Sequence, residues 1–151
     1  LNKIFYLDLY GNKKEATVSE LGLGYRKSNI DDSIIITKSE FTFEYGEKEE
    51  IHEKLNYIKN IRLKTQPIRE KTSGSTFKNP PNHFAAELIE NAGCKGLNIG
   101  DASVSDKHAN FLINNGKASA TEIEDLGKKI IDRVFNKFNI LLEWEVKIIG
   151  V

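Results

Sequence analysis

The chain has 151 residues, enough for one domain or one and a half, and its 22 basic and 22 acidic side chains cancel. A balanced charge creates no global field that would favour nucleic acid or a membrane surface, and no apolar run approaches the ~20 residues that a membrane span needs. The single cysteine, Cys94, cannot form an internal disulfide, so a reducing cytoplasm is the expected location. We expect Cys94 to be a small packed side chain rather than a catalytic thiol.

The first third of the chain is predicted to be mostly β-structure. Strands are predicted over residues 3–9, 14–18 and 33–45. The segment 22–28 between them holds too much glycine for a regular element. It is predicted to be a loop that displays Tyr25 and Arg26.

A charged helix is predicted over residues 47–65, because Ile51, Leu55 and Ile58 recur at helical spacing. Its acidic start and basic end both suit the helix dipole. A long irregular connection follows Gln66-Pro67.

This connection marks the predicted domain boundary. Residues 1–66 are expected to belong to one domain and residues 67–151 to a second. The second is predicted to hold two helices and two strands, over residues 83–92, 111–114, 119–138 and 141–149.

Several details support the two predicted helices. Phe84, Leu88 and Ile89 are expected to face inward from the shorter one, and Gly93 to supply its left-handed cap. Ser119 begins the longer one, with the spacing of a capping box to an acid three residues on. The longer helix has an apolar stripe of Ile123, Leu126, Ile130 and Val134, expected to be core.

The segment Gly74-Ser75-Thr76-Phe77-Lys78-Asn79-Pro80 offers a hydroxyl, an ammonium and a carboxamide within five residues. Pro80 fixes its own φ and disfavours the helical region for Asn79, so this segment must be a loop. Such a loop could hold an anionic substrate and give it a proton. It could equally be a surface turn, since the same residue types dominate turns.

Five blocks carry a family resemblance in order and spacing. They are Gly24-Tyr-Arg-Lys-Ser28, Gly74 to Pro80, His83 to Gly93, Val104 to Phe111, and Leu142 to Gly150. Together they resemble the C-terminal half of the UDP-N-acetylenolpyruvoylglucosamine reductase family of flavoenzymes, and the resemblance covers essentially the whole chain.

The resemblance implies an α+β fold, in which the end of a flavin-binding domain precedes a small α+β substrate-binding domain. It implies NADPH-dependent, FAD-containing reduction of UDP-N-acetylglucosamine-enolpyruvate to UDP-N-acetylmuramate, in peptidoglycan precursor synthesis. The sequence holds no glycine-rich dinucleotide fingerprint. We therefore expect the FAD site to lie largely in an N-terminal portion missing from this chain. The alternative is a non-catalytic nucleotide-sugar-binding module derived from the same fold.

The resemblance also assigns three catalytic residues. Adding hydride to an electron-poor alkene leaves negative charge that must be stabilised and then quenched by a proton. Arg26 is expected to stabilise the enol-like intermediate, assisted by Glu145, and Ser75 to donate the proton to carbon. Each has an ordinary structural alternative: Arg26 in a surface ion pair, Glu145 in solvent, and Ser75 in a turn.

Substrate-binding roles are implied for three further residues: Asn79 at the diphosphate, Lys78 as an electrostatic partner, and Tyr25 in the same cleft. His108 is expected to be packed or hydrogen-bonded, with Asn110 lining the site. No metal site is expected, because the three histidines are too scattered. Trp144 departs from the proline usual in the family, and Asp101 from a common glycine.

Overall fold

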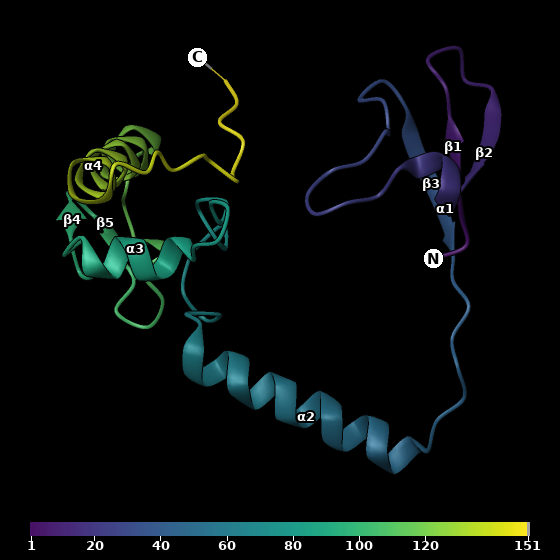
Figure 1. The fold of residues 1–151 in the computed structure, drawn as a ribbon, viewed down its shortest axis with the longest axis horizontal. Helices are drawn as coiled ribbons and strands as arrows, with labels where there is room; N and C mark the ends of the chain where they lie inside the picture. Colours follow the sequence, from purple (N-terminus) through teal and green to yellow (C-terminus); the bar gives the residue numbers. More distant parts are fainter. Residues whose placement is uncertain (151) are drawn as a thin grey trace. The chain divides into compact units, whose positions relative to one another are not determined.

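A computed structural model describes residues 1–150 of the chain; Val151, the last residue of the predicted second domain, lies outside them. The chain divides into two compact units, Leu1–Glu50 and Ile51–Val151, which we call the first and second units and describe separately. Helices and antiparallel sheets occur together, which confirms the α+β prediction (Figure 1). The predicted domain boundary at residues 66/67 stays a prediction.

The first unit contains an antiparallel three-stranded sheet in the order β2-β1-β3. Its strands are β1 (Lys3–Leu7), β2 (Lys13–Thr17) and β3 (Ile35–Glu40). The last is shorter than the predicted strand over 33–45, because its pairing partner β1 begins opposite its end, at the pair Lys3 and Glu40. A single-turn helix, α1 (Val18–Leu21), was not predicted; Thr17 and Glu20 form a capping box at its start.

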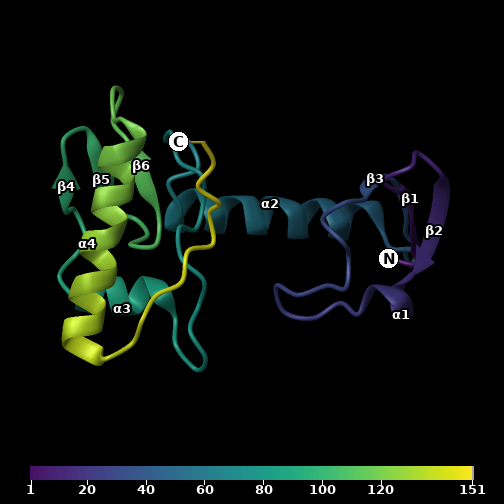
Figure 2. The same ribbon diagram turned by 90° about the horizontal axis from the view of Figure 1, so that it is seen from above.

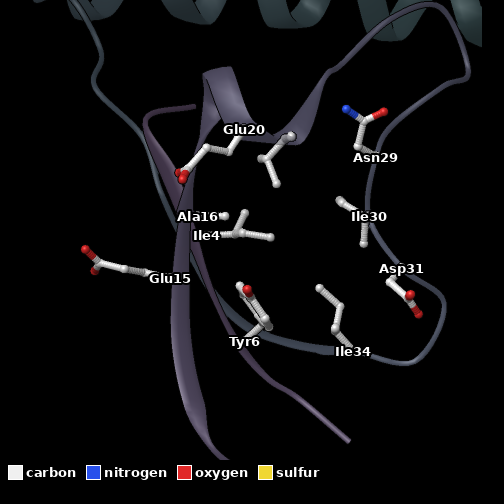
Figure 3. Close-up of a pocket in the computed structure, with 10 residues that line it drawn as sticks. Ile4, Tyr6, Glu15, Ala16, Glu20, Asn29, Ile30, Asp31 and Ile34 are labelled. Atoms are coloured by element: carbon white, nitrogen blue, oxygen red, sulfur yellow. The ribbon is translucent and has the colours of Figure 1, made fainter.

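The interior of the first unit is small and partly hollow. Figure 3 shows apolar side chains of the sheet facing Ile30 and Ile34 from the returning loop. These residues line a pocket with a volume of about 250 Å³. Only Ile4 and Leu21 are buried apolar residues within this unit. The first unit therefore lacks a packed core of the usual kind.

The helix α2 (Lys48–Thr65) confirms the prediction over residues 47–65. None of its residues is buried, and Ile51, Leu55 and Ile58 are all exposed. It ends as expected before Pro67, whose carbonyl starts the next turn by accepting the N–H of Glu70 at 2.9 Å. No helix among residues 1–150 is long and apolar enough to cross a bilayer.

The second unit packs two helices against a small antiparallel sheet in the order β4-β5-β6. Its elements are α3 (Ala85–Asn91), β4 (Asn98–Ile99), β5 (Ala102–Val104), β6 (Leu112–Asn114) and α4 (Ala120–Phe138). Figure 2 shows α4 running across the sheet. The predicted core stripe of α4 is confirmed at Leu126, Ile130 and Val134, which are fully buried, while Ile123 is half-buried.

Several local predictions for the second unit are confirmed. The capping box is present: the Ser119 hydroxyl accepts the Glu122 N–H at 3.2 Å, and the Glu122 carboxylate accepts the Ser119 N–H at 2.8 Å. Gly93 has a left-handed φ of 70° after α3, and Leu88 and Ile89 are buried. Phe84 is not inward; it is the 62% exposed N-cap residue of α3.

The predicted closing strand over 141–149 is wrong. In this stretch only Trp144 forms an isolated bridge, with Phe77. The partner segment cannot continue the pairing, because Pro80 and the following proline lack N–H donors. The strands β4 and β5 were missed because they have only two and three residues, too few for an alternating pattern to stand out.

Candidate functional site

The segment that carries Ser75 is bound on one side to the loop before β6. Ser75 pairs with Phe111 as an isolated bridge, and the Thr76 N–H donates to the Asn110 carbonyl at 2.8 Å. The Asn110 side chain then accepts the Phe77 N–H at 2.9 Å and donates to the Phe77 carbonyl at 2.8 Å. Asn110 and Phe77 are both buried, so the Asn110 amide replaces a strand partner for backbone groups that bulk solvent does not reach.

The other side of the Ser75 segment is bound to the segment that carries Glu145. The Glu145 N–H donates to the Thr76 carbonyl at 2.9 Å, and the Lys78 N–H donates to the Glu143 carbonyl at 2.9 Å. Ser75 and Glu145 are both half-buried. The structure thus brings two of the three predicted catalytic residues onto hydrogen-bonded neighbouring segments.

Asn79 and Lys78 extend the same loop. The Asn79 Oδ1 accepts the N–H of Ala85, the first residue of α3, at 3.0 Å. Since that bond identifies the oxygen end of the carboxamide, the Nδ2 group supplies the two hydrogen-bond donors of this side chain. The Lys78 ammonium forms an ion pair with Glu143 at 3.3 Å, and both side chains are largely exposed. Such a pair contributes little to stability and can rearrange around a ligand.

Tyr25 and Arg26 lie in the first unit, on an exposed turn closed by a bridge between Gly24 and Lys27. Arg26 has a left-handed φ of 54°, an uncommon conformation for a non-glycine residue that often marks a functional turn. Its guanidinium carbon lies 5.4 Å from the centroid of the Tyr25 ring, which is cation–π geometry. Of the predicted site residues, only these two lie in the first unit.

His108 and Cys94 have structural surroundings, as expected from the sequence. The His108 ring meets Phe111 edge-on at 4.7 Å, and its Nδ1 accepts the Asn110 N–H at 3.3 Å. Burial lowers the pKa of His108 and raises the pKa of the fully buried Cys94 thiol. Residues 1–150 contain no group of three or more His, Cys, Asp or Glu side chains that could hold a metal ion.

The sequence did not predict the hydrogen bonds of the Asn110 side chain, nor the close contact between Gly127 and the Trp144 indole. Asn110 was expected to line the site; its side chain is hydrogen-bonded to both backbone groups of Phe77, two residues after Ser75. A glycine in the middle of a strongly helical pattern was the available signal for Gly127, since glycine is unfavourable there without a packing reason. Asp101 has a local role: its carboxylate accepts the Lys117 N–H at 3.1 Å in the turn before α4.

A family model described as UDP-N-acetylenolpyruvoylglucosamine reductase, C-terminal domain, matches residues 66–149. The chain belongs to this family. Curated relatives of that name from Rickettsia bellii (strain RML369-C) and Rickettsia conorii are each 45% identical, over 150 and 144 residues. The matches cover 99% and 95% of this chain, and 50% and 49% of the respective relatives.

The fold has a match among solved structures of the family. A crystal structure of UDP-N-acetylenolpyruvylglucosamine reductase from Thermus caldophilus superposes with a TM-score of 0.81 at 35% identity, covering 96% of this chain and 52% of that one. The resemblance seen in the sequence is therefore confirmed. The chain spans about half the length of the family members that it matches.

Proposed function

We propose that this chain is the C-terminal portion of an NADPH-dependent, FAD-containing reductase that converts UDP-N-acetylglucosamine-enolpyruvate to UDP-N-acetylmuramate. The reaction would serve peptidoglycan precursor synthesis in the cytoplasm, and through it wall growth, cell shape and cell division. The observation that supports it best is the hydrogen bond between the Glu145 N–H and the Thr76 carbonyl at 2.9 Å. It places a carboxylic acid and a serine hydroxyl on adjoining segments of a half-buried loop pair.

We expect the chain to contribute at most one edge of a flavin site rather than a whole dinucleotide site. Gly74 has a φ of 93°, and no atom beyond its two chain neighbours lies within 4 Å of where a Cβ would stand. A planar group can therefore approach the backbone next to Ser75. We expect the rest of the FAD site to lie in a preceding part of a longer protein. When bound, reduced FAD would supply the hydride, after reduction by NADPH.

The chain's own residues would handle the charge and the proton. Hydride addition to one alkene carbon leaves an electron pair on the other, delocalised into the carboxylate of the enolpyruvyl group. Arg26 and Glu145 would stabilise that enol-like charge. The Ser75 hydroxyl would give its proton to the carbon, forming the new C–H bond, and recover one from solvent. A serine is a weak acid, so this step requires a strongly basic carbon and a fixed geometry.

The substrate's diphosphate would bind at the Asn79 loop. Calorimetric titration of UDP-N-acetylglucosamine-enolpyruvate should show weaker binding to Asn79→Ala than to wild type. Asn115→Ala, an exposed asparagine on the β6–α4 turn, is the matched control and should bind normally. Equal affinity of the Asn79→Ala variant would remove the diphosphate role.

The deciding experiment is Ser75→Ala in the complete, flavin-loaded reductase, followed by stopped-flow absorbance. Flavin reduction by NADPH should proceed at the wild-type rate, whereas reoxidation by substrate should slow by roughly 10²–10⁴-fold, the usual contribution of a positioned proton donor. Ser75→Cys should recover part of the rate, because a thiol is a proton donor of similar size. Ser73→Ala, a nearby exposed serine, is the control. Reoxidation of the Ser75→Ala variant at the wild-type rate would make Ser75 a turn residue and defeat the proposal.

A second candidate follows from the length of the chain. Since the chain spans about half of its relatives, it could act as a nucleotide-sugar-binding module without chemistry. Adding the flavin-binding portion of a relative, and then measuring both FAD binding by flavin fluorescence and reductase activity, separates the two functions. The reductase proposal expects weak or no FAD binding to this chain alone and full activity only with a flavin-binding portion. If supplying that portion restores FAD binding without reductase activity, the binding module is favoured.

A further inference from the structure

The segment that carries Glu145 belongs to neither sheet of the structure. It is tied to the Ser75 segment by the two backbone hydrogen bonds on either side of the bridge between Phe77 and Trp144. Two bonds leave such a segment able to tilt. The side chain that precedes Glu145 is therefore the main candidate for fixing its position.

The Trp144 side chain packs between the buried Phe77 ring and α4. Its ring centroid lies 5.0 Å from that of Phe77, at an interplanar angle of 41°. The far edge of the indole lies against the backbone of Gly127. A Cβ at residue 127 would stand 2.8 Å from Cζ2 and Cζ3 of the indole, and closer still to Cη2. Real Cβ atoms do not approach so closely, so the indole occupies the space that any side chain at residue 127 would need.

Gly127 has no other reason to be glycine. It sits inside α4, where alanine would form a better helix, and its φ is outside the left-handed region that requires glycine. It is buried, as are Leu126 before it and Ile130 one turn later. The close approach of Trp144 explains the residue.

We infer that the contact between Trp144 and Gly127 positions Glu145 beside the Ser75 segment, so that Gly127 and Trp144 are positioning residues for proton delivery. This inference rests on the proposed function, in which Glu145 and Ser75 act on the same intermediate. Glu145 follows Trp144 directly and is bonded through its own N–H to Thr76. An indole pushed off Gly127 must therefore move Glu145 relative to Ser75.

The backbone hydrogen bonds beside residue 144 limit which other residues could stand at that position. The flanking hydrogen bonds use the Glu143 carbonyl and the Glu145 N–H, and neither uses the N–H of residue 144. A residue without an N–H, such as proline, would keep both bonds but leave Gly127 uncovered. Gly127 and Trp144 therefore act as a matched pair.

The test is Gly127→Ala in the complete, flavin-loaded reductase. Flavin reduction by NADPH and the Kd for the UDP-sugar should stay within about twofold, whereas flavin reoxidation by substrate should fall by roughly 10²-fold, as expected for a displacement of about 1 Å. Trp144→Leu in the Gly127→Ala background should recover at least about tenfold of that loss, because the smaller side chain leaves room for the methyl group. Lys128→Ala, an exposed change at the next position of α4, should have no effect.

A spectroscopic readout accompanies the kinetics, because Trp144 is the only tryptophan of the chain. In the 151-residue chain, Gly127→Ala should shift Trp144 emission to the red, increase its quenching by acrylamide and speed hydrogen exchange of the Glu145 amide. If Gly127→Ala prevents folding, Trp144→Leu alone provides the kinetic test. It removes the contact with Gly127 without a clash, and it should also slow flavin reoxidation by substrate.

The outcomes separate the inference from the proposed function. If Ser75→Ala leaves reoxidation unchanged, the proposed function fails, whatever the effect of Glu145→Gln. If those two variants slow reoxidation while Gly127→Ala and Trp144→Leu match wild type, the proposed function stands and the positioning role is wrong. Equal losses in both half-reactions would also overturn the positioning role, since they would indicate general damage to the fold.

Discussion

The two units of this chain bury their apolar residues very differently. The second unit has a continuous core of thirteen buried residues around α4 and the sheet β4-β5-β6. The first has two buried apolar residues and a pocket where a core would be, while Tyr10, Ile35 and Phe43 are exposed. Burial of apolar side chains therefore supports the second unit far more than the first, in which the backbone pairing of the sheet carries a larger share of the structure.

The largest expected effect is a core truncation in the second unit. Leu126→Ala should lower the free energy of unfolding by about 2–5 kcal/mol, because it empties a fully buried position. Ile36→Ala on the exposed side of β3 should change it by no more than about 0.5 kcal/mol. Urea unfolding followed by Trp144 fluorescence reports the second unit alone, and circular dichroism reports both. Equal losses in the free energy of unfolding from the two substitutions would contradict the difference in core packing between the units.

The next effect concerns Asn110, whose side chain is hydrogen-bonded to the backbone of Phe77. Asn110→Ala removes the partners of the buried Phe77 N–H and carbonyl. Leaving a buried backbone group unsatisfied costs about 1–3 kcal/mol, so the second unit should lose at least that much. Asn115→Ala, which removes an exposed hydrogen bond to Ser103, is the matched control and should be nearly neutral. A neutral Asn110→Ala would mean that water replaces the amide.

The sequence predicted best where one local pattern decided the structure. The helix α4 was recognised from its capping box and apolar stripe, and both are present. The strand predicted over 141–149 failed because alternation in Glu143-Trp144-Glu145 also suits a segment with a single bridge. The pattern within residues 141–149 does not indicate whether a partner strand exists, because that depends on the prolines in the distant segment that pairs with it.

The candidate site was predicted as a set of residue types, but not as an arrangement. The family motif indicated Ser75 and Glu145, yet their adjacency depends on hydrogen bonds across about seventy residues of sequence. The helical pattern around Gly127 indicated a packing reason for a glycine, but not which residue it contacts, because its partner Trp144 lies on another segment. Such long-range contacts carry no periodic signal in the sequence.

A smaller effect compares the same capping device in both units. Ser119→Ala removes the N-cap of the nineteen-residue helix α4 and should cost about 1 kcal/mol. Thr17→Ala removes the cap of the four-residue α1 and should cost less in the Trp144 transition, because that transition reports the other unit. Denaturation midpoints of the two variants, measured by Trp144 fluorescence, give the comparison. A Thr17→Ala loss as large as that of Ser119→Ala would show that the units unfold together.

The smallest effect is a pH dependence confined to the second unit. Burial lowers the pKa of His108 below its ordinary 6.5, so between the two pKa values the unfolded chain binds more protons than the folded one. Stability contributed by neutral His108 is therefore complete above pH 6.5 and is lost as pH falls from there toward the folded-state pKa. Protonation would also remove the Nδ1 lone pair that accepts the Asn110 N–H, which lowers stability at acidic pH as well.

His108→Gln should flatten the pH dependence of the urea midpoint near pH 6.5, whereas His52→Gln on the exposed helix α2 should leave it unchanged. If wild type and His108→Gln lose stability in parallel on acidification, His108 is not the titrating group and the second unit owes its acid sensitivity to its carboxylates.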